Sequence, residues 1–120
     1  MAIEEIGSFE DAVAFALTLP DTELSTSYGK PAVKVKSNGR AFLYTGHEHQ
    51  CSFGIGIDLD TIEILKETDP DTFFQTPHYE GWPAVLIRYG SDDPERVRAM
   101  IERSRDWTAA KPPPKARKRK

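Results

Sequence analysis

One stretch organises this chain, and it reads Gln75-Thr76-Pro77-His78-Tyr79-Glu80-Gly81-Trp82-Pro83-Ala84-Val85-Leu86-Ile87-Arg88. Its first half crowds aromatic, imidazole and proline side chains together, which predicts a tight turn and a candidate site beside it. Its second half predicts a strand over residues 84–89 that is apolar on both faces, with Val85 and Ile87 on one and Ala84 and Leu86 on the other, and therefore a central, covered strand.

The composition is typical of a globular domain, with 38% hydrophobic and 29% charged residues in a chain of 120. The sequence contains no run of about 18 apolar residues, so we expect no membrane-spanning segment. The N-terminal stretch lacks the apolar core of a signal peptide, and the single cysteine cannot form an internal disulfide. We therefore expect a cytoplasmic protein.

Charge divides the chain into two parts. Of the 16 basic residues, six lie in the last ten positions, where there is no acid, so residues 1–110 carry ten basic and 19 acidic residues, or −9. We predict one domain over residues 1–110, which is acidic, and a basic, proline-rich, disordered tail over residues 111–120.

The first half of the chain predicts a helix followed by strands. Ser8 is the expected N-cap of a helix that ends near Leu19, with Asp11 as its capping partner. Residues 22–27 predict a short edge strand. Asn38-Gly39 predicts a hairpin with a two-residue type I′ turn.

That turn fixes a register in which one face of the hairpin meets the core and the other is open. The core face is expected to carry Val33, Val35, Phe42 and Tyr44, and the open face to carry Ala32, Lys34, Lys36, Leu43 and Thr45.

The second half continues with a strand over residues 51–58, whose core face carries Phe53, Ile55 and Ile57. Gly54 and Gly56 leave its other face bare. A glycine in a strand often marks a close approach to the backbone, and we favour a bulge or a covering side chain over a ligand.

Three helical segments are expected in this half. One begins at an Asp60 cap, a short turn begins at Asp69-Pro70 and carries Phe73 and Phe74 inward, and the last helix begins at Asp92/Asp93-Pro94. The order is helix, three or four strands, helix, one or two strands, helix. It predicts an α+β two-layer sandwich, in which helices cover one face of an antiparallel sheet.

Several ordered motifs over residues 8–110 resemble the YjbR/MmcQ family of small bacterial proteins. They are Tyr28-Gly29-Lys30-Pro31, Asp69-Pro70, Thr76-Pro77-His78-Tyr79 and Gly81 before the last strand. The resemblance implies a fold of the secretion-chaperone-like or frataxin-like kind. It also implies DNA binding through a double-wing arrangement of β-hairpins. It supplies no catalytic residues.

The candidate nucleic-acid-binding residues fall in two segments. The hairpin has no acid between Ser25 and His47 and carries Lys30, Lys34, Lys36 and Arg40; the tail carries Lys115, Arg117, Lys118, Arg119 and Lys120. Lysines on one face of a hairpin can contact phosphates as a wing does. The alternatives are an edge kept soluble by its lysines and a tail that serves only solubility.

Two other candidate sites are weaker. A ligand site would join Tyr28, His78, Tyr79 and Trp82, although a histidine after proline in a turn more often has a structural role. His47, His49 and Cys51 suit zinc, but they lie at a predicted turn without an evident fourth ligand. We expect no metal, no cofactor and, in the absence of a nucleophile elbow or phosphate loop, no enzymatic activity.

Two functions follow from these residues. The leading one is weak, salt-dependent binding of DNA by the hairpin and the tail. The alternative is a module that binds a protein or small ligand, in which Leu43, Gly54, Gly56 and Leu86 form a groove or a dimer surface on the sheet. Whether the protein is a monomer or a homodimer stays open.

Overall fold

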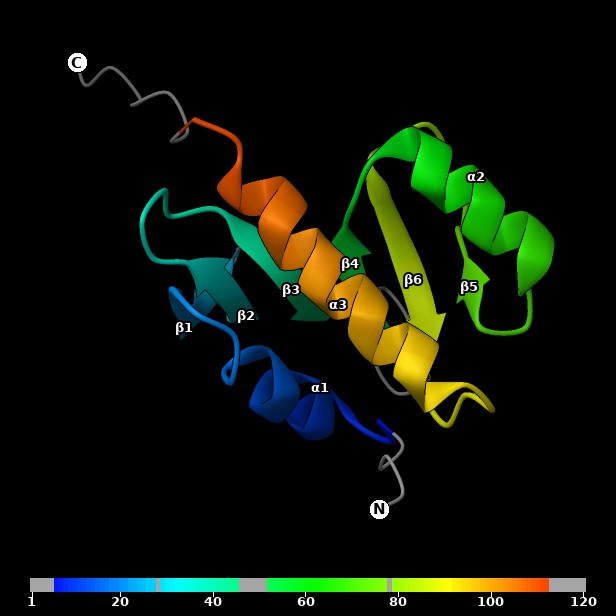
Figure 1. Cartoon of the computed structure of the whole chain (residues 1–120), viewed down its shortest axis with the longest axis horizontal. Coiled ribbons are helices and arrows are strands. Elements are labelled where there is room, and N and C mark those ends of the chain that lie inside the picture. Colours follow the sequence, from blue (N-terminus) through cyan, green and yellow to red (C-terminus); the bar gives the residue numbers. More distant parts are fainter. Residues whose placement is uncertain (1–5, 28, 46–51, 78, 113–120) are drawn as a thin grey trace.

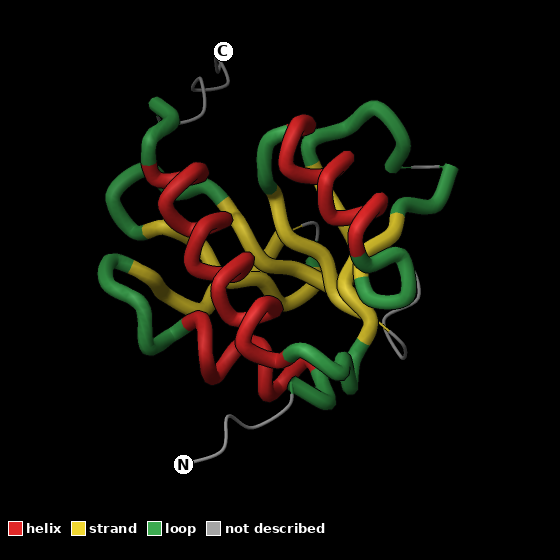
Figure 2. Tube along the Cα trace, turned by 45° about the vertical axis from the view of Figure 1, so that its right-hand side comes forward, coloured by secondary structure: helices red, strands yellow, loops and turns green. Residues whose placement is uncertain are grey.

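The computed structural model describes residues 6–27, 29–45, 52–77 and 79–112. Within these ranges three helices cover one face of a six-stranded antiparallel sheet (Figures 1 and 2), so the predicted α+β class is confirmed. The elements are α1 (Phe9–Ala16), β1 (Thr22–Ser27), β2 (Lys30–Val35), β3 (Ala41–Thr45), β4 (Ser52–Gly56), α2 (Leu59–Thr68), β5 (Phe73–Phe74), β6 (Ala84–Arg88) and α3 (Pro94–Ala109).

The sheet has the strand order β1-β2-β3-β4-β6-β5. Helices α1 and α3 lie over strands β2 to β4, and α2 lies over β5 and β6 (Figure 2). The core fills the space between these two layers. Its largest buried side chains include Phe42, Phe53, Phe73, Ile55, Ile57, Ile62, Leu65, Ile87 and Ile101. The core face predicted for β4 is confirmed, with Phe53, Ile55 and Ile57 in the core, but its other face is buried rather than bare. The covered strand predicted for β6 is confirmed.

Two of the predicted helix starts are confirmed. The Ser8 hydroxyl accepts a hydrogen bond from the Asp11 amide at 3.1 Å, and the Asp11 carboxylate accepts one from the Gly7 amide at 3.1 Å. In α3 the Asp93 carboxylate accepts from the Arg96 amide at 3.1 Å, with Pro94 at the first helical position. These caps satisfy amides that have no partner inside the helix.

The predicted start of α2 is wrong by two residues, because its N-cap is Asp58 rather than Asp60. The Asp58 carboxylate accepts hydrogen bonds from the Thr61 amide at 3.0 Å and the Thr61 hydroxyl at 2.8 Å. Burial acts to raise the pKa of Asp58, but these hydrogen bonds outweigh it and hold the pKa below its ordinary value.

We expect Asp58→Ala to lower the free energy of unfolding by about 0.5–2 kcal/mol, as loss of a cap does. Asp60→Ala is the matched control and should change it by less than about 0.5 kcal/mol. Because the folded pKa of Asp58 is depressed, its contribution is present above the unfolded pKa of about 3.9 and is lost as pH falls below it. Urea unfolding at neutral and acidic pH measures both effects, and equal losses for the two variants would contradict this assignment.

The hairpin between β2 and β3 differs from the prediction. A type I′ turn needs positive φ at both central residues. Gly39 has a φ of 72°, whereas among the described non-glycine residues only Asp21 has a positive φ. The loop covers residues 36–39 and is closed by the Gly39 amide donating to the Val35 carbonyl at 2.8 Å.

The longer loop changes the register of the two strands. Val33 pairs with Leu43 and Ala32 with Tyr44, and a bulge follows between Val33 and Lys34. Leu43 therefore faces the helices and is fully buried, while Tyr44 lies on the opposite face. The predicted exposure of Leu43 and burial of Tyr44 under the helices are both wrong, because moving a register by one residue exchanges the two faces.

The turn predicted at Asp69-Pro70 is present as one hydrogen-bonded turn that does not continue into a helix, and Phe73 points inward as predicted whereas Phe74 does not. Asp69 is the C-cap of α2, and its carbonyl accepts from the Phe73 amide at 3.0 Å. The chain then turns into the edge strand β5, where Phe73 packs in the core and Phe74 lies on the other face. The Arg88 guanidinium lies over the Phe74 ring, 4.0 Å from its centre.

In the described part of the chain, no helix combines the length and apolar character needed to cross a membrane.

Candidate nucleic-acid interface

Asn38 connects the hairpin to the end of α3. Its amide nitrogen donates to the Thr108 carbonyl at 2.8 Å and to the Lys111 carbonyl at 3.0 Å, and its amide oxygen accepts from the Arg40 amide at 3.0 Å. The side chain is only 8% exposed. Asn38 therefore provides a hydrogen-bond donor to carbonyls at the C-terminal end of α3, where a helix lacks donors of its own. The residues around Asn38 in the sequence did not predict this role.

The next two contacts fix the beginning of the predicted tail. The Arg40 guanidinium donates to the Pro112 carbonyl at 2.6 Å. The Lys111 ammonium lies 3.8 Å from the centre of the Trp107 ring. Residues 111 and 112 thus pack on the body beside the hairpin (Figure 1). The tail residues Lys115, Arg117, Lys118, Arg119 and Lys120 lie outside the described residues.

Two acidic residues, Asp21 and Glu23, lie near the hairpin lysines in the fold although they precede the acid-free segment 25–47. Lys34, which is half-buried on the face opposite the helices, pairs across strands with Glu23 of β1. Lys36 is exposed in the loop rather than on β2, and its amide donates to the Asp21 carbonyl at 2.8 Å. Lys30 is exposed at the start of β2. Strand β1 therefore offsets part of the positive charge of the hairpin.

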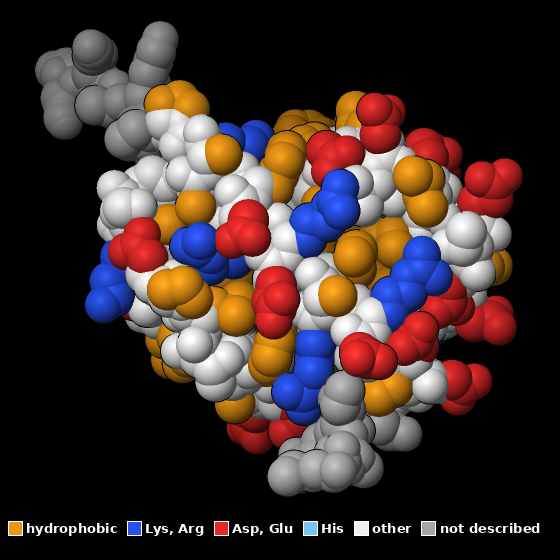
Figure 3. All heavy atoms as spheres, viewed as in Figure 1, with side chains coloured by type: hydrophobic (Ala, Val, Ile, Leu, Met, Phe, Trp, Pro, Cys, Tyr) orange, Lys and Arg blue, Asp and Glu red, His pale blue; other side chains and the backbone are white. Residues whose placement is uncertain are grey.

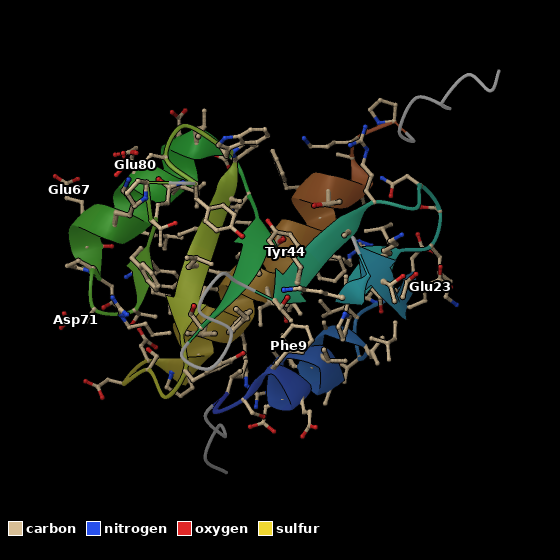
Figure 4. All side chains as sticks on the ribbon, turned by 180° about the vertical axis from the view of Figure 1, so that it is seen from behind. Phe9, Glu23, Tyr44, Glu67, Asp71 and Glu80 are labelled. Atoms are coloured by element: carbon tan, nitrogen blue, oxygen red, sulfur yellow. The ribbon has the colours of Figure 1, made fainter. Side chains whose placement is uncertain are left out.

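Acidic side chains gather at the other end of the molecule. Residues 58–71 contain six acids and one lysine, and they form α2 and the turn that follows it. Figure 3 shows this concentration over α2, at the opposite end from the chain terminus beside the hairpin. Figure 4 shows Glu67 and Asp71 at that end from behind. The acids of residues 58–71 therefore lie at the end of the molecule away from the hairpin.

Tyr44 covers the sheet face opposite the helices (Figure 4). A Cβ atom on Gly54 would lie 2.6 Å from Tyr44 Cε1, and one on Gly56 would lie 3.6 Å from both Pro83 O and Trp107 Cζ3. The favoured covering side chain is thus confirmed. Burial raises the pKa of the Tyr44 hydroxyl, and nearby Tyr79 raises it further.

The alternative groove on this face is not formed as predicted. Leu43 lies on the helix face, Leu86 is fully buried, and Gly54 is covered by Tyr44. The side chains of Tyr44 and Trp107 lie against Gly54 and Gly56, so the predicted groove is not open there.

Gln75 holds the turn that precedes β6. Its amide nitrogen lies within hydrogen-bonding distance of three carbonyls, those of Tyr79 (3.1 Å), Trp82 (3.2 Å) and Ala84 (2.7 Å). Its amide oxygen accepts from the Lys66 ammonium at 2.9 Å. The two N–H groups of Gln75 are thus shared among three carbonyls, and this side chain links the loop to the start of β6.

The structure brings together part of the predicted ligand site. Tyr79 is half-buried near Tyr44, and burial raises its pKa, while Trp82 is 65% exposed. Tyr28 and His78 lie outside the described residues. Tyr44 and Trp107 lie beside Gly54 and Gly56, and the sequence did not reveal them because only the fold places them there.

No group of three metal-ligating side chains is present among the described residues. The predicted candidates His47, His49 and Cys51 lie outside them.

Comparison with known proteins gives one match. No curated protein and no solved structure matches the sequence. A sequence model of the YjbR family matches residues 17–107, which comprise strands β1 to β6, helix α2 and most of α3. Since this match covers well over half of the 120 residues, the chain belongs to the YjbR family.

Proposed function

We propose that this protein is a non-catalytic DNA-binding protein that contacts phosphates with the hairpin and the C-terminal tail together. The observation that carries this proposal is the attachment of residues 111 and 112 to the hairpin by Asn38 and Arg40. Two basic segments that are more than 70 residues apart in the sequence thereby start from the same end of the molecule.

The charge distribution supports weak binding that depends steeply on salt. Phosphate contacts by Lys and Arg release counterions, so each contact adds about 0.9 to the slope of log affinity against log salt concentration. The tail supplies most of the positive charge, because Asp21 and Glu23 lie beside the hairpin lysines. The acids of α2 lie at the far end, so DNA at the hairpin is distant from the strongest repulsion.

The proposal predicts that the tail dominates the affinity for DNA. A chain ending at Pro112 keeps the contacts of Asn38 and Arg40 but lacks five cations. We expect it to bind random duplex DNA at least about 10-fold more weakly, with a salt slope lower by up to about 4. Lys34→Glu/Lys36→Glu should weaken binding by a smaller factor. Fluorescence anisotropy of labelled duplex over a salt series measures both.

Glu67→Lys is the matched control, because it makes the net charge more positive at the far end of the molecule. If DNA binding depends on where the positive charge lies rather than on the net charge, Glu67→Lys should bind DNA with the wild-type affinity. Equal affinities of the full-length, truncated and hairpin variants, or no binding at low salt, would show that the proposal is wrong.

A further inference from the structure

Strand β1 forms one edge of the sheet, and in the described part of the chain it has a strand partner only on the side of β2 (Figure 1). It is six residues long, whereas β5 at the other edge has two. Edge strands that avoid pairing with other chains are commonly short or carry lysine, proline or a bulge. Strand β1 has neither lysine nor proline, and its pairing with β2 is regular over its whole length. This edge is therefore open to another strand.

Alternate residues of β1 turn their backbone groups away from β2. In an antiparallel ladder, pairs that exchange hydrogen bonds alternate with pairs that do not. The Lys36 amide donates to the Asp21 carbonyl at 2.8 Å, so this pair is of the hydrogen-bonded kind. The next residue of the hairpin, Val35, instead donates to the Arg40 carbonyl at 2.9 Å, away from β1. By this alternation, the residues of β1 that present amide and carbonyl groups to the open edge are Thr22, Leu24 and Thr26.

The side chains of these three residues lie on the helix side of the sheet. Leu24 pairs with Val33, which is fully buried in the core, and yet Leu24 is 56% exposed. Helices α1 and α3 lie over β2 to β4 and leave Leu24 uncovered. The helix side of this edge is therefore an apolar residue between two uncharged threonines.

We infer that two copies of this chain pair through β1, antiparallel and centred on Leu24, to form a dimer with one continuous sheet. The sequence of β1 is self-complementary about this centre. Leu24 lies opposite its own copy, and Thr22 lies opposite Thr26. On the other face Glu23, which Figure 4 shows at this edge, lies opposite Ser25, so no two acids face each other. Like charges directly opposite would destabilise the pairing.

A second copy of β1 fits this edge better than an arbitrary strand does. Another strand could use the same backbone groups, but it would need an apolar residue opposite Leu24 and no acid opposite Glu23. In the dimer each Leu24 lies between Val33 of its own β2 and the other Leu24, so the apolar row of the core continues across the axis. One strand from each copy is a small interface, so we expect a weak, concentration-dependent dimer.

The test is sedimentation velocity of the full-length chain from low micromolar to submillimolar concentration, without nucleic acid. The weight-average mass should rise from that of one chain toward twice that mass. Leu24→Lys places two like charges opposite each other at the axis and should raise the dissociation constant at least about 5-fold. Ile64→Lys is the matched control, because Ile64 on α2 is also 56% exposed, and it should dimerise as the wild type does.

Leu24→Pro tests the backbone pairing itself. It removes an amide that faces the open edge, where proline is tolerated in a strand. This variant should stay folded by circular dichroism and should not dimerise. A wild-type chain that is monomeric at every concentration would overturn the inference, as would a dimer that Leu24→Lys leaves unchanged or that Ile64→Lys weakens equally. Because nucleic acid is absent, none of these results depends on the proposed DNA binding.

Discussion

Gly54→Ala is expected to lower the free energy of unfolding by roughly 1–3 kcal/mol, the usual cost of an added methyl group in a closely packed site. The new Cβ would lie 2.6 Å from Tyr44 Cε1 and 2.9 Å from Tyr44 Cδ1. The ring is a rigid body in the middle of the sheet face, so it must move before the methyl group fits. Urea unfolding with an unchanged m-value measures the loss.

Gly56→Ala is the matched control, two residues along the same face of β4. Its Cβ would have its nearest neighbours at 3.6 Å, which is ordinary contact. We expect no loss, or a gain of up to about 1 kcal/mol because alanine restricts the unfolded chain.

A double-mutant cycle then identifies Tyr44 as the cause of the Gly54 effect. In a Tyr44→Ala background the methyl group has room, so the cost of Gly54→Ala should fall by at least about 0.5 kcal/mol. Equal costs in both backgrounds, or at Gly54 and Gly56, would contradict the close approach of the Tyr44 ring.

Gln75→Leu is expected to destabilise the fold by about 2 kcal/mol. Leucine has a similar size, but the substitution removes the side-chain donor of the Ala84 carbonyl and the second donor of the Tyr79 and Trp82 carbonyls, which keep backbone partners. A buried carbonyl left without a partner costs about 1–3 kcal/mol. The substitution also releases the turn that carries Trp82. Urea unfolding gives the stability, and iodide quenching of Trp82 in a Trp107→Phe background reports how freely the indole moves.

Lys66→Met is the control for this prediction, because it removes only the bond to the Gln75 amide oxygen and the ion pair with Glu63. Both involve partly exposed groups, so the loss should stay within about 1 kcal/mol. A Gln75→Leu effect no larger than this would show that the turn is held by its backbone bonds alone.

Local sequence signals predicted those parts of the fold that depend on neighbouring residues. The caps at Ser8 and Asp93 were found because the side chain and the amide it serves are three residues apart. The cap of α2 was missed because Asp58 and Asp60 both precede the helical pattern, and only the course of the chain out of β4 selects Asp58.

The hairpin shows how a distant element overrides a local preference. Asn38-Gly39 favours a two-residue turn when considered alone. In the fold, the Asn38 side chain instead bonds carbonyls at the end of α3, about 70 residues away. The loop lengthens, the register moves by one residue, and Leu43 and Tyr44 exchange faces.

The candidate site was predictable as a set of residue types but not as an arrangement. The cations of the hairpin and tail, and the aromatic residues before β6, are visible in the sequence. Their relation to Asp21, Glu23, Tyr44 and Trp107 is not, because it depends on which strands pair and in which register.

The α+β class, the core face of β4, the covered strand β6 and the concentration of basic charge at the C-terminus were predictable from the amino-acid sequence. These follow from periodicity and composition, which act over a few residues. Only the tertiary structure decided that Gln75 holds the Pro77–Pro83 turn, that Tyr44 fills the face above Gly54, and that the tail begins beside the hairpin. Those contacts form between residues that only the folded chain brings together, so no local sequence pattern predicts them.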